Sequence, residues 1–201
     1  MAATPYGRSK LAVEWMLADA ARAHAMRYVA LRYFNVAGAD PKGRLGQSAP
    51  NATHLIRRTV QTALGQHARL EIFGRDYPTP DGTCLRDYIH VSDLIDAHRA
   101  ALAYLRAGGA SLECNAGYGR GYSVQDVIDV VKRVANVDFQ VNIANRRPGD
   151  LAAVIANPKL IARALGWRPK RDGLDLIVRH TLDWEHGLIN KSWATRPAVT
   201  T

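Results

Sequence analysis

The sequence predicts an α/β fold, and three observations support this prediction. Thr4-Pro5 is a helix-start signal, and apolar residues then recur at helical spacing to about His24. A mostly apolar run rich in aliphatic and aromatic residues follows at Tyr28–Phe34, as in a buried strand. Helical and extended segments continue to alternate along the chain, with Gly- and Pro-rich stretches between them. This order is typical of an α/β unit with parallel strands.

The remaining elements are expected in the following order. Further strands are predicted at 70–73, 88–91, 112–115 and 139–143, with loops at 36–53 and 74–84. Further helices are predicted at 53–65, 93–105, 124–135, 157–166 and 172–184.

Several residues are expected to define the ends and faces of these helices. Ser92, Ser123 and Asp172 are predicted N-caps, and Asp126 stands where a capping box with Ser123 requires a partner. On the helix at 93–105, the residues expected to face inward are Leu94, Ala97, His98, Ala101 and Leu105.

The composition fits one globular domain, or one domain with part of another. The chain has 201 residues, of which 47% are hydrophobic and 22% are charged, and its formal net charge is +9. The basic residues are scattered and are not interleaved with aromatic residues, so a nucleic-acid-binding surface is not indicated. An anionic small molecule such as a nucleotide diphosphate fits this charge better.

Other classes of site are not indicated either. Cys84 and Cys114 are the only cysteines, so a disulfide framework is not expected. The histidines show no metal-binding spacing, and we expect no metal site. No apolar stretch reaches ~18 residues, and there is no signal-peptide pattern, so we expect a cytoplasmic protein that does not enter a membrane.

Tyr6 and Lys10 are four residues apart, which places both side chains on one face of the first helix. A free tyrosine has a pKa near ~10, too high for a base at neutral pH. An ammonium group one turn away and the positive end of the helix both favour the phenolate. The pair therefore suits a tyrosine base. From the spacing alone, however, a surface tyrosine beside a solvated lysine is the more common explanation.

Longer motifs strengthen the interpretation of this pair. Tyr6–Leu11, Leu31–Ala39 and Asp87–Leu94 occur in that order, and together they resemble the extended short-chain dehydrogenase/reductase family. Within that family, Ile72–Thr83 and Arg147–Asp150 look like the UDP-glucose 4-epimerases. Several long motifs in the right order are far more specific than the tyrosine–lysine spacing alone.

The resemblance covers about residues 5–184 and implies a fold. This fold is an incomplete NAD-binding Rossmann domain, consisting of the catalytic helix and the last strands, plus the smaller α/β substrate-binding domain. Residues 1–35 would be the C-terminal remnant of the Rossmann domain. Residues 36–190 would mainly form the UDP-sugar domain, with about 87–106 returning to the Rossmann part. Residues 191–201 would be a disordered tail.

In the family, a Rossmann half with a glycine-rich loop precedes the catalytic helix, whereas this sequence starts at that helix. The chain therefore looks like the C-terminal part of an epimerase, without the loop that holds the NAD pyrophosphate. A glycine-rich run does occur at Gly117–Gly121. Its G-x-G-x-G spacing differs from the dinucleotide fingerprint, and the family has a glycine loop here that lies outside the cofactor site.

The resemblance also implies the residues of the site. Tyr6 and Lys10 would be catalytic and would contact NAD, and Tyr33 and Phe34 would line the nicotinamide pocket. The residues implied to bind the UDP-sugar, with the two arginines on its diphosphate, are Asn35, Thr53, His54, Leu55, Glu71, Ile72, Phe73, Arg86, Tyr88, Arg147 and Asp150.

The implied activity is interconversion of UDP-glucose and UDP-galactose through a transient 4-keto sugar and NAD. Because half of the family's structure is missing from the sequence, we expect the chain alone to be inactive. Two alternatives remain open: a non-catalytic UDP-sugar-binding fragment, and a 4-epimerase for another UDP-sugar such as UDP-xylose/UDP-arabinose. The family resemblance implies a homodimer for the full-length enzyme.

Overall fold

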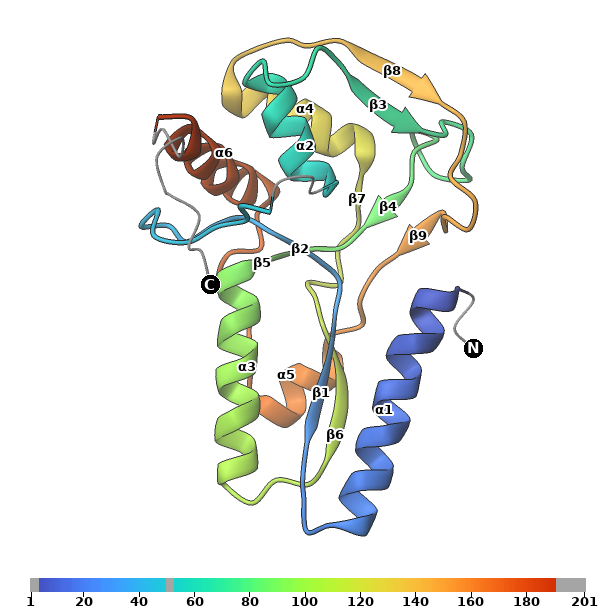
Figure 1. The fold of residues 1–201 in the computed structure, drawn as a ribbon, viewed down its shortest axis with the longest axis vertical. Coiled ribbons are helices and arrows are strands. Elements are labelled where there is room, and N and C mark those ends of the chain that lie inside the picture. The colour runs from blue at the N-terminus through green and yellow to red at the C-terminus, as the bar shows by residue number, and fades with distance from the viewer. Residues whose placement is uncertain (1–3, 50–52, 191–201) are drawn as a thin grey trace, which may run out of the picture.

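The structure is a computed structural model that describes residues 4–49 and 53–190. Its helices and strands confirm the predicted α/β fold (Figure 1), whereas the expected tail at 191–201 lies outside the described residues. The helices are α1 (Pro5–Ala23), α2 (Leu55–Ala63), α3 (Val91–Arg106), α4 (Val124–Ala135), α5 (Lys159–Leu165) and α6 (Leu174–Asn190). The strands are β1 (Val29–Tyr33), β2 (Asn35–Ala37), β3 (Leu70–Phe73), β4 (Leu85–Arg86), β5 (Tyr88–His90), β6 (Leu112–Ala116), β7 (Tyr122–Ser123), β8 (Val141–Ala144) and β9 (Ala153–Val154).

The lower part of the molecule in Figure 1 consists of α1, α3 and α5 around the parallel strands β1 and β6. Helices α3 and α5 bury apolar surface against these strands, which is the main stabilising force in this part. The buried residues of this cluster are Ile89, Leu94, Ala97, Cys114, Ala116, Ile161 and Trp167.

Helix α1 is attached to the lower part by charge more than by apolar burial. Thr4 caps the helix as predicted, because its Oγ1 accepts a hydrogen bond from the amide three residues on. None of the helix residues is buried, and Trp15 is 63% exposed. Glu14 accepts a hydrogen bond of 2.6 Å from Arg32 of β1, and this bond lowers the pKa of the Glu14 carboxyl.

The upper part consists of α2, α4 and α6, with the parallel pair β3 and β8 beside them (Figure 1). Between the two parts, β4 pairs with β7 and β9, and β2 pairs in parallel with β5. The buried residues of the cluster between the three helices are Ile56, Val60, Tyr88, Val127, Val131, Leu174, Ile177, Val178 and Leu182.

Helix α4 has the ends that the sequence predicts. The Ser123 Oγ accepts a hydrogen bond from the Asp126 amide at 2.9 Å, and the Asp126 carboxylate accepts one from the Ser123 amide at 2.8 Å. This reciprocal capping box confirms the prediction. In the described part of the chain, no helix is long and apolar enough to cross a membrane.

The start of α3 differs from the prediction. The helix begins at Val91, and His90 rather than Ser92 is the N-cap residue. The His90 ring is buried at the end of β5, where its Nδ1 accepts a hydrogen bond of 3.0 Å from the Ser92 amide. His98 was expected to face inward but is exposed, because it lies at the edge of the buried stripe and its ring bonds to the Leu94 carbonyl of its own turn.

Several elements begin one or two residues later than predicted, among them β1, α2, α5, α6 and β8. Helix α6 starts at Leu174, and the carbonyl of Gly173, not of Asp172, accepts the hydrogen bond from the Ile177 amide. Strand β8 starts two residues after Phe139, because the Phe139 ring packs against the apolar clusters of the upper part instead of joining the strand pair.

Two histidines join α3 to α6. The Nε2 atom of His90 lies 2.9 Å from the Nδ1 atom of His180. Because the His90 Nδ1 accepts from a backbone amide, its proton must sit on Nε2, so His90 donates to His180. Burial lowers the pKa of His90 to about 4; the nearby His180 and Arg171 lower it further, and Asp93 opposes the shift. Burial also lowers the pKa of His180, with Arg171 and Arg179 acting in the same direction and Asp183 and Asp40 opposing.

The buried neutral His90 makes stability depend on pH. An unfolded histidine titrates near ~6.5, so the stability that neutral His90 provides is complete above that pH and is lost as pH falls toward its folded pKa. We expect the unfolding temperature of the chain to fall between about pH 7 and pH 5. His90→Asn keeps a capping side chain and should flatten this dependence, while the exposed His24→Asn should keep the wild-type slope. Parallel curves for wild type and H90N, measured by circular dichroism, would contradict this role.

Candidate functional site

Tyr6 and Lys10 lie on one face of the first turns of α1, as their spacing predicts. The Lys10 Nζ lies 5.2 Å from the centroid of the Tyr6 ring, which is within cation–π distance. The Tyr6 side chain is 72% exposed at the positive end of the helix. A ligand can therefore reach the hydroxyl from solvent.

Tyr33, Phe34 and Asn35 lie where β1 passes into β2. Tyr33 is exposed at the end of β1 and Phe34 is half-buried, whereas Asn35 begins a second short strand. The Asn35 amide and its side-chain Nδ2 donate to the carbonyl of Asp87 at 3.1 Å and 3.3 Å. Asn35 is therefore held against the segment that contains Arg86, rather than standing at a free strand end.

Phe73 and Arg147, distant in sequence, form one contact. The Arg147 Cζ lies 3.7 Å from the centroid of the Phe73 ring. The parallel pairing of β3 with β8 brings them together, because Phe73 ends β3 and Arg147 follows β8. In β3, Glu71 is exposed, whereas the Ile72 side chain is buried, so Ile72 presents only its backbone to a ligand.

A tight turn connects this contact to a second one. The sequence Arg147-Pro148-Gly149-Asp150 has the pattern of a type II turn, with Gly149 at φ +84° and a hydrogen bond of 3.2 Å from the Asp150 amide to the Arg147 carbonyl. The turn places the Asp150 carboxylate 3.5 Å from the guanidinium of Arg86. The turn therefore links the Phe73–Arg147 contact to the Arg86–Asp150 ion pair.

Backbone carbonyls hold Arg86 in place. Its Nη1 donates to the carbonyls of Leu85 at 2.9 Å and Leu151 at 2.8 Å. The second bond depends on the parallel register of β4 and β9, which sets Arg86 opposite Val154. A guanidinium fixed in this way loses little conformational entropy when it binds a phosphate.

The other predicted substrate residues lie in different settings. Thr53 and His54 are exposed before α2, which Leu55 begins, and the His54 Nδ1 lies 3.2 Å from the Gln47 Nε2. Tyr88 faces the core between the helices, and burial raises the pKa of its hydroxyl far above its usual range. The structure therefore gathers the arginines, Asp150 and Phe73 but directs the Tyr88 side chain inward.

A second contact between an arginine and an aromatic ring lies beside the site, and the sequence motifs do not predict it. The Arg146 Cζ lies 4.1 Å from the Tyr77 ring centroid, and its Nε donates to Asp76 at 2.6 Å, which lowers the pKa of that carboxyl. Tyr77 is buried, and its hydroxyl has no hydrogen-bond partner within residues 4–49 and 53–190. The only sequence feature that could have indicated this contact is that Arg146 directly precedes Arg147.

The glycine-rich run is not built like a dinucleotide loop. The Tyr118 amide donates to the Oδ1 of the buried Asp87 carboxylate at 3.0 Å, and the Gly119 amide donates to its Oδ2 at 2.8 Å. At the start of α4, the Val124 and Gln125 amides donate to the Thr83 hydroxyl at 3.1 Å and 3.4 Å. These donors are the ones that a pyrophosphate would need, and the protein itself already uses them.

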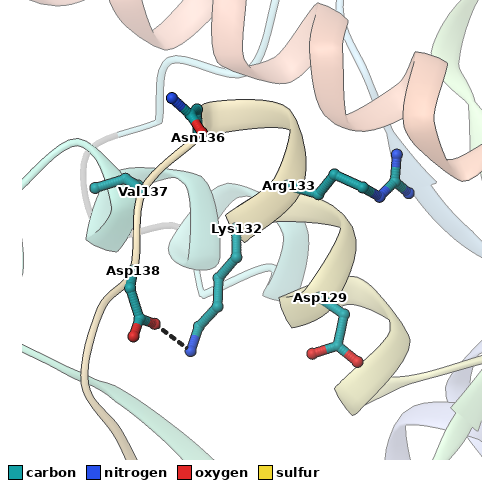
Figure 2. A pocket seen from close by; sticks show the side chains of 6 residues that line it. All are labelled: Asp129, Lys132, Arg133, Asn136, Val137 and Asp138. Carbon is teal, nitrogen blue, oxygen red and sulfur yellow. Dashed lines mark ion pairs between the residues drawn. The ribbon is translucent and has the colours of Figure 1, made fainter.

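A surface hollow lies apart from this site, and the described residues contain no metal-ligand cluster. Within the described ranges, no group of three or more His, Cys, Asp or Glu side chains is arranged to hold a metal ion. A shallow hollow of about 610 Å³ lies at the C-terminal end of α4 (Figure 2), where Lys132 and Asp138 form an ion pair of 2.5 Å. None of the predicted site residues lines it; its lining residues are Asp129, Lys132, Arg133, Asn136, Val137 and Asp138.

Comparison with known proteins identifies the family. The model of the NAD dependent epimerase/dehydratase family matches residues 2–117. The chain belongs to this family. It is 56% identical over 184 residues to a UDP-glucose 4-epimerase of Azospirillum brasilense, covering 92% of this chain and 53% of that protein. A UDP-glucose 4-epimerase of Halalkalibacterium halodurans is 47% identical over 180 residues, covering 90% and 54%.

Solved structures of epimerases share the fold of this family member. The UDP-glucose 4-epimerase from Brucella ovis, in complex with NAD, is 46% identical with a TM-score of 0.85, covering 89% of this chain and 55% of that one. The enzyme from Stenotrophomonas maltophila, with bound NAD and formylated UDP-arabinopyranose, is 38% identical with a TM-score of 0.90, covering 96% and 57%. The chain thus spans about half the length of the relatives it matches.

Gly74, which begins the loop after Phe73, should tolerate no side chain. Its φ is +85°, and a Cβ there would lie 2.6 Å from the Arg146 Cγ and 2.8 Å from the Tyr77 Cε2. Gly43→Ala is a matched control, because Gly43 has φ +65° but nothing within 4 Å of an added Cβ. We expect G43A to cost about 1 kcal/mol of unfolding free energy and G74A about 1–3 kcal/mol more. Equal losses in urea unfolding would show that the contact with Arg146 and Tyr77 is not tight.

Proposed function

We propose that the protein to which this chain belongs is a UDP-glucose 4-epimerase that interconverts UDP-glucose and UDP-galactose with NAD. The observation that carries the proposal is the turn that joins Phe73 and Arg147 to Asp150 and Arg86 in one site. An aromatic ring beside an exposed guanidinium suits a uracil base next to its phosphates. Two arginines suit a diphosphate, and a carboxylate suits ribose hydroxyls. The relatives named UDP-glucose 4-epimerase supply the reaction.

We propose further that two regions divide the work of the site. Residues 1–35 and about 87–106 would belong to the NAD-binding Rossmann domain, and the rest of 36–190 would hold the UDP-sugar. Support comes from the grouping of α1, β1 and α3 in the lower part, apart from β3 and β8 (Figure 1). The exposed apolar side chains of α1 are consistent with further packing partners in a homodimeric enzyme.

The described residues fit one end of NAD. Tyr6, Lys10 and Tyr33 are exposed and suit contact with the nicotinamide and its ribose, whereas the amides of the glycine-rich run are already bonded to Asp87. NAD, when bound, supplies the oxidation and re-reduction of the sugar at C4. Because the chain holds only part of this cofactor site, we propose that it is inactive alone.

Within the complete enzyme, the residues of this chain would have distinct roles. Tyr6, as the phenolate, would take the proton of the sugar 4-hydroxyl and return it, and the Lys10 ammonium would stabilise that phenolate. Arg86, Arg147 and Phe73 would hold the UDP group and leave the sugar free to turn. The binding energy of the UDP group thereby keeps the sugar in the site, while either face of the sugar ring can turn toward the cofactor.

The UDP site can be tested on the chain itself. Arg147→Ala removes one phosphate donor and the contact with Phe73, so we expect the dissociation constant for UDP to rise about tenfold in calorimetric titration. Arg133→Ala is the matched control, because Arg133 is an exposed arginine of α4 that pairs with Asp175 outside the site. Equal affinities of R147A and R133A for UDP would place the nucleotide elsewhere.

The catalytic role of Tyr6 needs an enzyme with both halves. A chimera would join the preceding half of the Azospirillum brasilense epimerase to this chain, since the two share 56% identity over the matched region. In this chimera, Tyr6→Phe should lower kcat by about 100-fold or more, the usual contribution of a general base, with UDP affinity unchanged. Tyr104→Phe on α3 should have no effect. A kcat for Y6F within about threefold of the parent would remove Tyr6 from the mechanism.

The same chimera separates the alternatives. A chimera that binds NAD and UDP but does not turn over any UDP-sugar would favour a non-catalytic UDP-sugar-binding role. Faster turnover of UDP-xylose or UDP-arabinose than of UDP-glucose would favour the pentose epimerase. The structural neighbour with bound formylated UDP-arabinopyranose makes the pentose a reasonable second candidate.

A further inference from the structure

Asp87 is a buried carboxylate to which none of the predicted roles applies. It lies between Arg86 and Tyr88, its side chain is fully buried, and its Oδ2 accepts hydrogen bonds from the amides of Gly119 at 2.8 Å and Ala156 at 3.2 Å. The Tyr118 amide donates to both oxygens, at 3.0 Å and 3.1 Å.

Within residues 4–49 and 53–190, the groups that donate to this carboxylate are backbone amides. Among the described residues, no ion pair includes Asp87. A buried carboxylate without a cationic partner is expensive to desolvate, so each of these hydrogen bonds helps to offset that cost. The packing is correspondingly tight, because a Cβ on Gly117 would lie 2.9 Å from the Asp87 Oδ2.

The Asp87 network fixes the register that positions Arg86. The Asp87 amide donates to the Val154 carbonyl at 3.1 Å, and its carboxylate holds Ala156, two residues further along the same segment. Together these bonds lock β9 against β4. That register delivers the Leu151 carbonyl, which accepts from the Arg86 guanidinium at 2.8 Å.

The backbone of the same residue positions Asn35. The Asp87 carbonyl accepts from both the amide and the side-chain Nδ2 of Asn35, at 3.1 Å and 3.3 Å. Asp87 therefore restrains both Arg86 and Asn35, which come from different segments of the chain.

We propose that Asp87 is a positioning residue that holds Arg86 and Asn35 together as a preorganised binding pair for the diphosphate of a nucleoside diphosphate. This inference rests on the proposed function, because it assumes that UDP binds at Arg86. Asp87 touches no ligand itself; it acts through the two residues that its backbone and side chain fix. Loss of its charge should therefore weaken contacts to phosphate and leave contacts to the base intact.

Asp87→Asn tests this inference because it keeps the size of the side chain but removes the charge. In NMR titrations of the chain, we expect D87N to raise the dissociation constant for UDP about tenfold and that for uridine less than about twofold. Ile161→Val is the control for general loss of stability, since Ile161 is buried in α5 away from the site. It should change neither affinity.

The outcomes distinguish this inference from the proposed function. If wild-type chain does not bind UDP, the proposed function of this site and the inference both fail. If wild type binds UDP and D87N binds it equally well, only the role of Asp87 is overturned. If D87N loses affinity for UDP and uridine to the same extent, Asp87 supports the fold in general and not the diphosphate pair.

If D87N does not fold, amide hydrogen exchange of the wild-type chain tests the proposal instead. Saturating UDP should slow amide hydrogen exchange at Gly119 and Ala156 by about tenfold or more, because ligand binding stabilises the network that positions its site. The amides of Lys170 and Arg171 are the internal control, since they donate to a different buried carboxylate, that of Asp93, at 3.0 Å and 2.8 Å. Equal slowing at both pairs, or none at Gly119 and Ala156, would overturn the proposal.

Discussion

The middle of the molecule depends on one buried charge. The Asp87 carboxylate accepts hydrogen bonds from three backbone amides, and those amides belong to the glycine-rich run and to the segment after β9. Charge-assisted bonds of this kind are roughly twice as strong as neutral ones. They are also directional, whereas the apolar clusters above and below stabilise without fixing a register. The short strands β4 and β9, two residues each, need such a constraint because their own ladder is small.

This constraint explains how the residues proposed to bind the nucleotide can be distant in sequence and still lie together. The position of the Arg86 guanidinium depends on the carbonyl of Leu151, just before β9. The positions of Asp150 and Arg147 depend on the turn before β9, and Arg147 also packs on the Phe73 ring. Each contact is weak alone, since an exposed cation–π pair or ion pair contributes about 1 kcal/mol or less. Their geometry is therefore set by the backbone frame rather than by the contacts themselves.

The sequence predicted most of the elements because local signals and tertiary packing agree there. The capping box of Ser123 with Asp126 and the end of the helix predicted at 157–166 depend on signals within a few residues. The structure agrees with both, since the capping box forms and α5 ends at Leu165. His90 could not be predicted as an N-cap, because the choice between His90 and Ser92 depends on burial at the end of β5 and on His180 of a distant helix. The contact of Phe73 with Arg147 likewise depends on the register of β3 with β8, which no local pattern encodes.

The two halves of the candidate site differ in rigidity, and this difference suits the proposed reaction. Arg86 and Asn35 are held by several backbone bonds each, whereas Tyr6 and Lys10 project from a helix that buries no residue within the described chain. The residues proposed to anchor the nucleotide all belong to this chain. The position of the tyrosine relative to that anchor depends on whatever packs against α1, because one ion pair with β1 restrains the helix only weakly. Under the proposed function, nucleotide binding and catalysis are therefore separable, because the residues proposed for the first are fixed within this chain and those proposed for the second are not.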